Sequence, residues 1–172
     1  MSTYIIAQLI GAVGYFFYIS APHLESQQKI IKVEAFACGL LCIQWFLMMQ
    51  YSLLVMNILI ITVSISALWA QDNPYIRTKL PLLYPLGVIC LLCVSKGTII
   101  DLIAITAFCL TVTSKLSTCI FKFRMYAGTT GLLITTSSIM ALAWPAAIFN
   151  AMFALGHGRK LALHHNTSQQ TA

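Results

Sequence analysis

Six side chains that could bind a small polar solute lie inside long apolar runs of the sequence. They are Gln8, Gln44, Trp45, Asn57, Asp101 and Asn150. Amides and carboxylates supply several hydrogen-bond donors and acceptors. Inside a membrane such groups usually face the interior of a helix bundle or a water-filled cavity. Trp45 follows Gln44 directly and could stack on a bound molecule, although packing is its more common role. These six are therefore the candidate substrate-binding residues.

The positions of Asn57 and Asn150 differ by 93, and each lies six residues inside its own apolar run. The same offset relates three further pairs: Gln8 and Asp101, Gln44 and Ser137, and Lys29 and Lys122. It also lays the first three apolar runs over the last three. Membrane carriers are often built from duplicated helix units. The spacing therefore predicts an internal repeat.

The depth of these residues can be estimated from the rise of an α-helix, 1.5 Å per residue. Gln8, Gln44, Asn57, Asp101 and Asn150 then all lie roughly 6–9 Å beneath the same boundary of the membrane. The sequence thus predicts one polar layer to which both halves contribute.

Each of these residues also has a purely structural interpretation. Asn and Gln often hold transmembrane helices together through hydrogen bonds worth about 0.6–2 kcal/mol. Asp101 could pair with Lys96, five residues earlier. Glu34 lies near the end of its run, where its carboxylate can reach the headgroups; a proton relay is the alternative.

The composition indicates what kind of protein carries these residues. Of the 172 residues, 59% are hydrophobic and 8% are charged, and the mean hydropathy is +0.86. Soluble domains carry about 25% charged residues, so this composition excludes a soluble enzyme and a nucleic-acid-binding protein. A helix needs about 20 apolar residues to cross the bilayer. The runs that meet this need in full or nearly so are residues 3–20, 33–50, 51–70, 80–95, 97–113, 125–143 and 144–160.

These seven runs predict an all-α transmembrane bundle with a 3+1+3 parallel repeat. Residues 1–79 form the first three-helix repeat, and residues 80–95 form a linker helix. Residues 96–160 form the second repeat, and residues 161–172 form a tail.

The basic residues predict the orientation of the bundle. With seven spans, every Lys and Arg except Lys96 falls on one side. Positively charged loops remain in the cytoplasm. We therefore expect a multi-pass membrane protein with its N-terminus outside and its C-terminal tail in the cytoplasm. The net charge of +6 then reflects topology rather than a nucleic-acid partner.

An intramembrane enzyme would need a nucleophile with a positioned base, or a metal site. Cys90 and Cys93 have the spacing of a metal motif, but Leu, Val and Ile surround them, which favours packing. We expect no catalytic residue, no metal and no cofactor.

The chain resembles the YgjV-type family of bacterial inner-membrane proteins, and this resemblance implies that the membrane is a bacterial inner membrane with the N-terminus in the periplasm. The resemblance rests on the segment 7–11 (Ala-Gln-Leu-Ile-Gly), on Asn57 in a span that ends near Trp69, and on a last span with Phe149-Asn150-Ala151. The layout more distantly resembles SWEET sugar transporters and their PQ-loop relatives. In those proteins paired asparagines line the solute pocket, which implies this role for Asn57 and Asn150. The Pro-Gln motif and the hinge prolines of that group are missing here, so a sugar substrate does not follow.

Two functions remain open from the sequence. In the first, the protein is a carrier or facilitator for a small polar solute, and one half rocks against the other around the polar layer. In the second, it is an accessory or structural membrane protein whose polar layer only holds the helices together. Membrane lipid is a partner in both cases, and association into a homo-oligomer is compatible with either.

Overall fold

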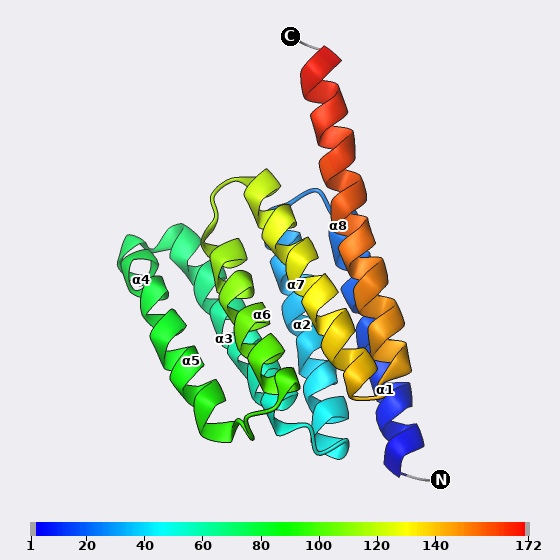
Figure 1. The fold of residues 1–172 in the computed structure, drawn as a ribbon. Coiled ribbons are helices and arrows are strands. Elements are labelled where there is room, and N and C mark those ends of the chain that lie inside the picture. Colours follow the sequence, from blue (N-terminus) through cyan, green and yellow to red (C-terminus); the bar gives the residue numbers. More distant parts are fainter. Residues whose placement is uncertain (1–2, 171–172) are drawn as a thin grey trace.

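The computed structural model describes the backbone of residues 3–170 and the side chains of residues 3–163 (Figure 1). This part of the chain contains helices and no strand. The elements are α1 (Thr3–Ser20), η1 (Ala21–His23), α2 (Gln27–Leu47), α3 (Tyr51–Asp72), α4 (Pro74–Lys79), η2 (Leu80–Leu82), α5 (Leu83–Val94), α6 (Ile99–Leu116), α7 (Ile120–Met140) and α8 (Trp144–Gln170). The predicted all-α bundle is confirmed.

Five helical segments of the described chain are long and apolar enough to cross a membrane. They are Thr3–His23, Gln27–Leu47, Tyr51–Asp72, Pro74–Val94 and Ile99–Leu116. The more polar α7 and α8 pack beside them in the same bundle. Large apolar side chains such as Phe16, Leu102 and Leu155 are exposed on the outer surface, as lipid contact requires. The chain is a multi-pass membrane protein.

The bundle consists of two triplets, α1–α3 and α6–α8, joined by the linker α4–η2–α5. Within each triplet the middle helix packs against both of its neighbours. Between the triplets, α1 packs against α8 and α3 packs against α6. The linker packs mainly against α3 and α6, at one side of the bundle (Figure 1). The arrangement is the predicted 3+1+3 parallel repeat.

The burial pattern repeats with the same offset as the two asparagines. Each of the eight buried residues of α2 lies 93 positions before a buried residue of α7. In α1 and α6 the offset relates Gly11 to Ala104 and Tyr15 to Phe108, all four buried. The two triplets therefore bury equivalent faces although their sequences differ.

The hairpins that join α2 to α3 and α7 to α8 are also equivalent. Met49 and Leu142 have left-handed backbones, with φ of 57° and 55°. The amide of Gln50 donates to the carbonyl of Trp45 at 3.0 Å, and that of Ala143 donates to Ser138 at 2.8 Å. Both hairpins thus close in the same way, which starts α3 and α8 at equivalent positions.

Several helices differ in length from the runs that hydropathy indicates. α2 begins at Gln27 and α7 begins at Ile120, because polar and charged residues are accommodated in the first turns of both helices. α8 continues to Gln170, so the expected tail of residues 161–172 is helical where its backbone is described. In the linker, Pro81 and Pro85 break the segment into α4, η2 and α5, because proline cannot donate a main-chain hydrogen bond.

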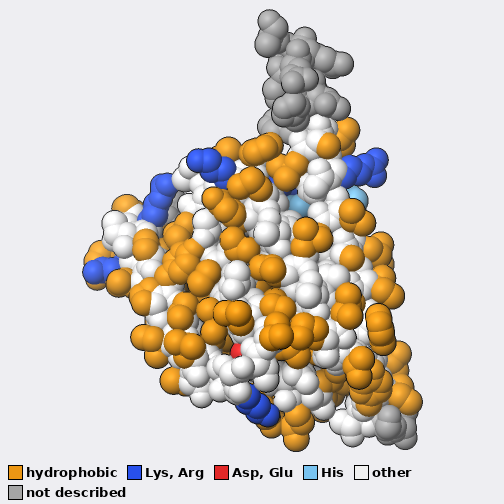
Figure 2. Space-filling model, viewed as in Figure 1, with side chains coloured by type: hydrophobic (Ala, Val, Ile, Leu, Met, Phe, Trp, Pro, Cys, Tyr) orange, Lys and Arg blue, Asp and Glu red, His pale blue; other side chains and the backbone are white. Residues whose placement is uncertain are grey.

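Charge is distributed unequally between the two ends of the bundle. Figure 2 shows most Lys and Arg side chains of this face towards the end from which α8 projects, and one at the opposite end. We call the first end the basic end. It holds the starts of α2 and α7 and the ends of α3 and α6. The opposite end holds the loop that contains Lys96.

Candidate functional site

Asn57 and Asn150 line one closed cavity between the two triplets. The cavity has a volume of about 10 Å³, which is room for about one water molecule. Asn57 on α3 is 4% exposed and Asn150 on α8 is 2% exposed. Helices of both triplets form the walls, so the cavity lies at the interface across which the triplets would move.

The two amides are held in the same way. Nδ2 of Asn57 donates to the carbonyl of Leu53 at 2.8 Å, and Nδ2 of Asn150 donates to the carbonyl of Ala146 at 2.8 Å. Each bond stays within its own helix, four residues back. Each side-chain carbonyl oxygen can accept a bond from a molecule in the cavity, and the Asn150 side chain also hydrogen-bonds to Tyr15 on α1.

Aromatic side chains complete the wall of this asparagine cavity. Trp45, 1% exposed, lines it together with Tyr15 and Tyr18. The Tyr15 ring stacks on Phe149 with centroids 5.6 Å apart, and Tyr18 stacks on Phe153 at 4.0 Å. These stacked pairs join α1 to α8. They supply apolar area around the two asparagines, an arrangement typical of small-molecule sites.

The two glutamines lie elsewhere, between α1 and α2. Gln44 is fully buried against Gly11, where a Cβ would come within 2.3 Å of its Cδ. Its amide atoms find no hydrogen-bond partner among the described residues. Gln8 is half-buried and donates to Sδ of Met48 at 3.6 Å. The structure does not bring either side chain to the asparagine cavity.

Asp101 caps the first turn of α6. Its carboxylate accepts from the amide of Thr98 at 2.9 Å and from the Thr98 hydroxyl at 2.8 Å. The backbone amide of Lys96, rather than its ammonium group, donates at 2.9 Å. Ser52 of α3 also donates to this carboxylate. Asp101 is therefore a capping residue that ties α3 to α6, away from the asparagine cavity.

A second closed cavity lies on the basic side of the first. It also measures about 10 Å³, and Glu34, Thr111, Ser114, Lys115 and Thr130 contribute polar groups to its wall. Tyr18 and Ile60 line both cavities and separate them. We call it the inner cavity. Towards the basic end, Lys115 also lines an open pocket of about 480 Å³ formed by the ends of α3 and α6 and the start of α2.

Four ionisable side chains are buried in the wall of the inner cavity or near it, and sequence reasoning missed most of them. Lys115 forms an ion pair with Glu34. Arg124 donates to the carbonyls of Pro22 at 2.8 Å and Leu24 at 2.9 Å. His157 packs edge-on against Phe153, with centroids 4.5 Å apart. Lys115 and Arg124 agree with the charge asymmetry between the two ends. Hydropathy and loop charge therefore gave no reason to place their side chains inside the bundle. Their one signal was their position next to the apolar runs.

Polar contacts close the interface between the triplets at both ends. At the end opposite the basic end, Ser52 bonds Asp101, and the Tyr4 hydroxyl donates to the carbonyl of Leu142 at 3.3 Å. At the basic end, Glu34 pairs with Lys115, and Arg124 holds the turn after α1. The two cavities are therefore enclosed between one closure made by hydrogen bonds and one that contains an ion pair.

The described residues contain no group of three or more potential metal ligands. All six cysteines are free, and Cys38 is buried. No family model, no curated protein and no solved structure matches the chain. What can be said of function therefore rests on the geometry of the two cavities.

Proposed function

We propose that this protein is a carrier or facilitator for a small polar solute, with a SWEET-like layout. The observation that carries the proposal is the pair Asn57 and Asn150, equivalent by repeat, lining one enclosed cavity between the triplets. All seven helical segments cross the bilayer in this proposal. The membrane is a bacterial inner membrane, with the basic end in the cytoplasm, because positively charged loops remain there.

The closed interface supports alternating access. Polar contacts join the triplets at each end of the cavities, and no covalent link other than the linker α4–η2–α5 joins them. Rocking one triplet against the other would separate one set of contacts at a time. A solute would then reach the asparagines from one side or the other. The cavities as they stand have room for about one water molecule each, which corresponds to an occluded state.

The bonding of Asn57 supports a binding role over the accessory alternative. Residues that hold helices together donate across an interface. Asn57 donates within its own helix instead. Asn150 makes the same bond and also hydrogen-bonds to Tyr15 of α1, whereas the stacked aromatic pairs and the contacts at the two ends join the triplets without Asn57.

Solute uptake into proteoliposomes tests this proposal. We would assay a panel of radiolabelled sugars, polyols and amino acids, first with the wild-type protein and then with Asn57→Ala and Asn150→Ala. We expect uptake of at least one solute above that of empty liposomes, and a tenfold or greater loss in each variant. Thr62→Ala is the matched control, because Thr62 makes the same bond to the carbonyl four residues back, at 3.0 Å, on the exposed face of α3.

Two outcomes would count against a carrier. In one, no solute in the panel is taken up by correctly folded protein. In the other, uptake occurs and both asparagine variants retain it. The accessory function would then be favoured, and it would be supported further if the variants lost stability instead of uptake.

A further inference from the structure

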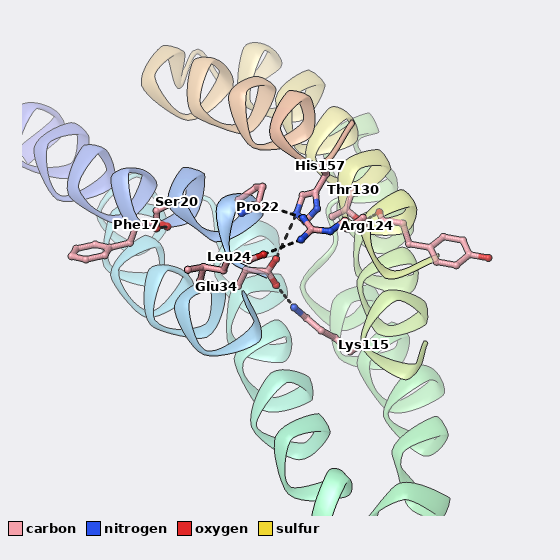
Figure 3. Close-up of polar contacts among 10 residues, drawn as sticks. Phe17, Ser20, Pro22, Leu24, Glu34, Lys115, Arg124, Thr130 and His157 are labelled. Atoms are coloured by element: carbon pink, nitrogen blue, oxygen red, sulfur yellow. Dashed lines mark hydrogen bonds and ion pairs between the residues drawn. The ribbon is translucent and has the colours of Figure 1, made fainter. Parts of the chain in front are cut away.

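Four buried side chains gather at the basic side of the inner cavity, and Figure 3 shows them pointing towards one another from four different helices. They are Glu34 (α2), Lys115 (α6), Arg124 (α7) and His157 (α8). Their exposed fractions are 4%, 6%, 7% and 0%. We call them the charged cluster. Burying ions is unfavourable unless they are paired, so this cluster requires an explanation beyond packing.

The charged cluster breaks the symmetry of the repeat. At an offset of 93, Glu34 corresponds to Ala127 and Lys115 corresponds to Pro22. Arg124 and His157 likewise correspond to Ile31 and Ser64. The acid therefore lies on the first triplet and the three basic side chains lie on the second. Their attraction acts across the interface that must open for transport.

The ion pair also lies on the path from the basic end to the asparagines. Lys115 lines both the open pocket and the inner cavity. Glu34 lines the inner cavity. A molecule moving between the open pocket and the inner cavity must pass this pair. Opening the basic end therefore requires that Glu34 and Lys115 separate.

One oxygen of Glu34 is available for a proton. Oε2 contacts Lys115, whereas Oε1 is buried and has no hydrogen-bond partner among the described residues. Nε2 of His157 lies 4.0 Å from Oε1, and neither ring nitrogen has a partner in the same part of the chain. A small approach would let a protonated Oε1 donate to Nε2 of a neutral imidazole. The ionised carboxylate of Glu34 thus has Lys115 as its partner, and the protonated carboxyl has His157.

The other groups around Glu34 include no second carboxylate among the residues that the structure describes. Tyr18 of α1 faces it across the inner cavity, and Cys38 lies one turn further along α2. From α6 and α7 come Lys115 and Arg124, and α8 contributes His157. The wall that α3 contributes is the apolar Ile60. Glu34 is therefore the one carboxylate among the described groups facing the inner cavity, and it alone balances the neighbouring positive charges.

We propose that Glu34 is a proton-binding site, and that its protonation opens the basic end of the carrier. This inference rests on the proposed function. A proton from water in the pathway forms an O–H bond at Oε1, and the attraction between Glu34 and Lys115 is lost. Lys115 and Arg124, both still positive, then repel each other, and Lys115 moves towards water in the open pocket that it already lines. When the proton returns to water, the carboxylate pairs with Lys115 again and the basic end closes.

Cysteine accessibility tests this without knowledge of the solute. In full-length protein whose native cysteines are replaced, Thr130→Cys places a thiol in the wall of the inner cavity. Its rate of labelling by methyl methanethiosulfonate is divided by that of Thr118→Cys, an exposed position at the basic end. This ratio removes the intrinsic effect of pH on thiol reactivity. We expect it to rise at least tenfold from pH 8 to pH 4, a range that includes the ordinary titration of a carboxyl group.

Two variants separate a proton switch from a merely structural ion pair. Glu34→Gln mimics the protonated carboxyl, so the ratio should be high at both pH values. Glu25→Gln removes an exposed acid at the same end and should behave as the parent. The inference is overturned if the ratio in the parent does not change with pH, a measurement that needs no folded Glu34 variant. It is also overturned if the pH dependence persists in Glu34→Gln.

This experiment fails separately from the transport assay. If no solute is carried but the accessibility of Thr130→Cys follows Glu34, the carrier proposal falls and the proton switch stands. If a solute is carried but the labelling ratio of Thr130→Cys changes neither with pH nor in Glu34→Gln, the carrier proposal stands and the proton switch falls.

Discussion

Asn57 and Asn150 hold their side-chain amides in matching geometry, each with Nδ2 2.8 Å from the carbonyl four residues back in its own helix. These carbonyls, of Leu53 and Ala146, lie within helices and accept main-chain bonds as well. The side-chain bonds are therefore dispensable for the helices, and they leave both asparagines facing the same cavity.

From this geometry, Asn57→Ala and Asn150→Ala should each lower the free energy of unfolding by only about 1 kcal/mol, the net value of one hydrogen bond. Asn150→Ala should cost somewhat more than Asn57→Ala, because Asn150 also hydrogen-bonds to Tyr15. Thermal unfolding of the purified protein in detergent measures both. A loss of several kcal/mol at either position would show that the asparagine holds the bundle together.

Gly11 lies where α1 contacts α2, and a Cβ there would come within 2.3 Å of Oε1 of the buried Gln44. Gly11→Ala should destabilise the protein by about 1–3 kcal/mol through overpacking. Adding Gln44→Ala should restore part of the loss. Gly39→Ala in α2 is the control, because a Cβ there meets nothing within 4 Å; it should be neutral or stabilising. Unfolding midpoints of the four proteins decide the point, and equal losses at both glycines would refute it.

Met49 and Leu142 have positive φ in the two equivalent hairpins. A left-handed backbone costs a residue with a Cβ about 1–2 kcal/mol. Met49→Gly and Leu142→Gly should therefore each stabilise the protein by up to about 1 kcal/mol, after the entropy cost of glycine. Ala141→Gly, at an ordinary φ of −83°, should destabilise it instead. Differential scanning fluorimetry can rank the three variants, and a stabilised Ala141→Gly would contradict this explanation.

Cys119 precedes α7 at the basic end and is exposed. Hydrogen bonds from the backbone amides of Lys122 and Phe121 hold the pKa of its thiol below the usual range. Because the thiolate is the reactive form, labelling of Cys119 by a maleimide should reach half its maximal rate at a lower pH than labelling of an ordinary exposed thiol. Thr118→Cys in a Cys119→Ser background provides an exposed thiol one residue further from the start of α7 than Cys119 is. A midpoint for Cys119 equal to or above that of the control would contradict the prediction.

The same cysteine tests the orientation. If the basic end lies in the cytoplasm, a membrane-impermeant maleimide should label Cys119 only after the inner membrane has been opened. Labelling in intact spheroplasts would place the basic end outside and reverse the proposed topology.

Much of this architecture could be predicted from hydropathy and from one pair of residues. The continuous apolar runs indicated helices, and the offset between Asn57 and Asn150 predicted a repeat that the burial patterns of α2 and α7 share. The starts of α2 and α7 were not predictable in this way, because their first turns contain Lys29 and Lys122. A hydropathy analysis assigns such charged residues to loops. The first turn of a helix can nevertheless contain them, because their long side chains reach the headgroup region.

The site was predictable only in part. Asn57, Asn150 and Trp45 meet at one cavity, but equal depth does not determine which side of a helix a residue occupies. Gln44 faces Gly11, and Asp101 faces its own helix start. Lys115 and Arg124 were interpreted as topology signals, since loop charge and buried charge look the same in sequence. Only packing distinguishes a lysine that reaches solvent from one that reaches Glu34.

The charged cluster has a consequence for how a duplicated protein can differ from a dimer. In a symmetric dimer of identical triplets, every residue occurs twice, so an acid at position 34 would also appear at the site that Ala127 occupies here. Joining both triplets in one chain removes that constraint. The basic end can then be held closed by the attraction between Glu34 on one triplet and Lys115 on the other. Asn57 and Asn150, in the middle of the bundle, remain at equivalent positions.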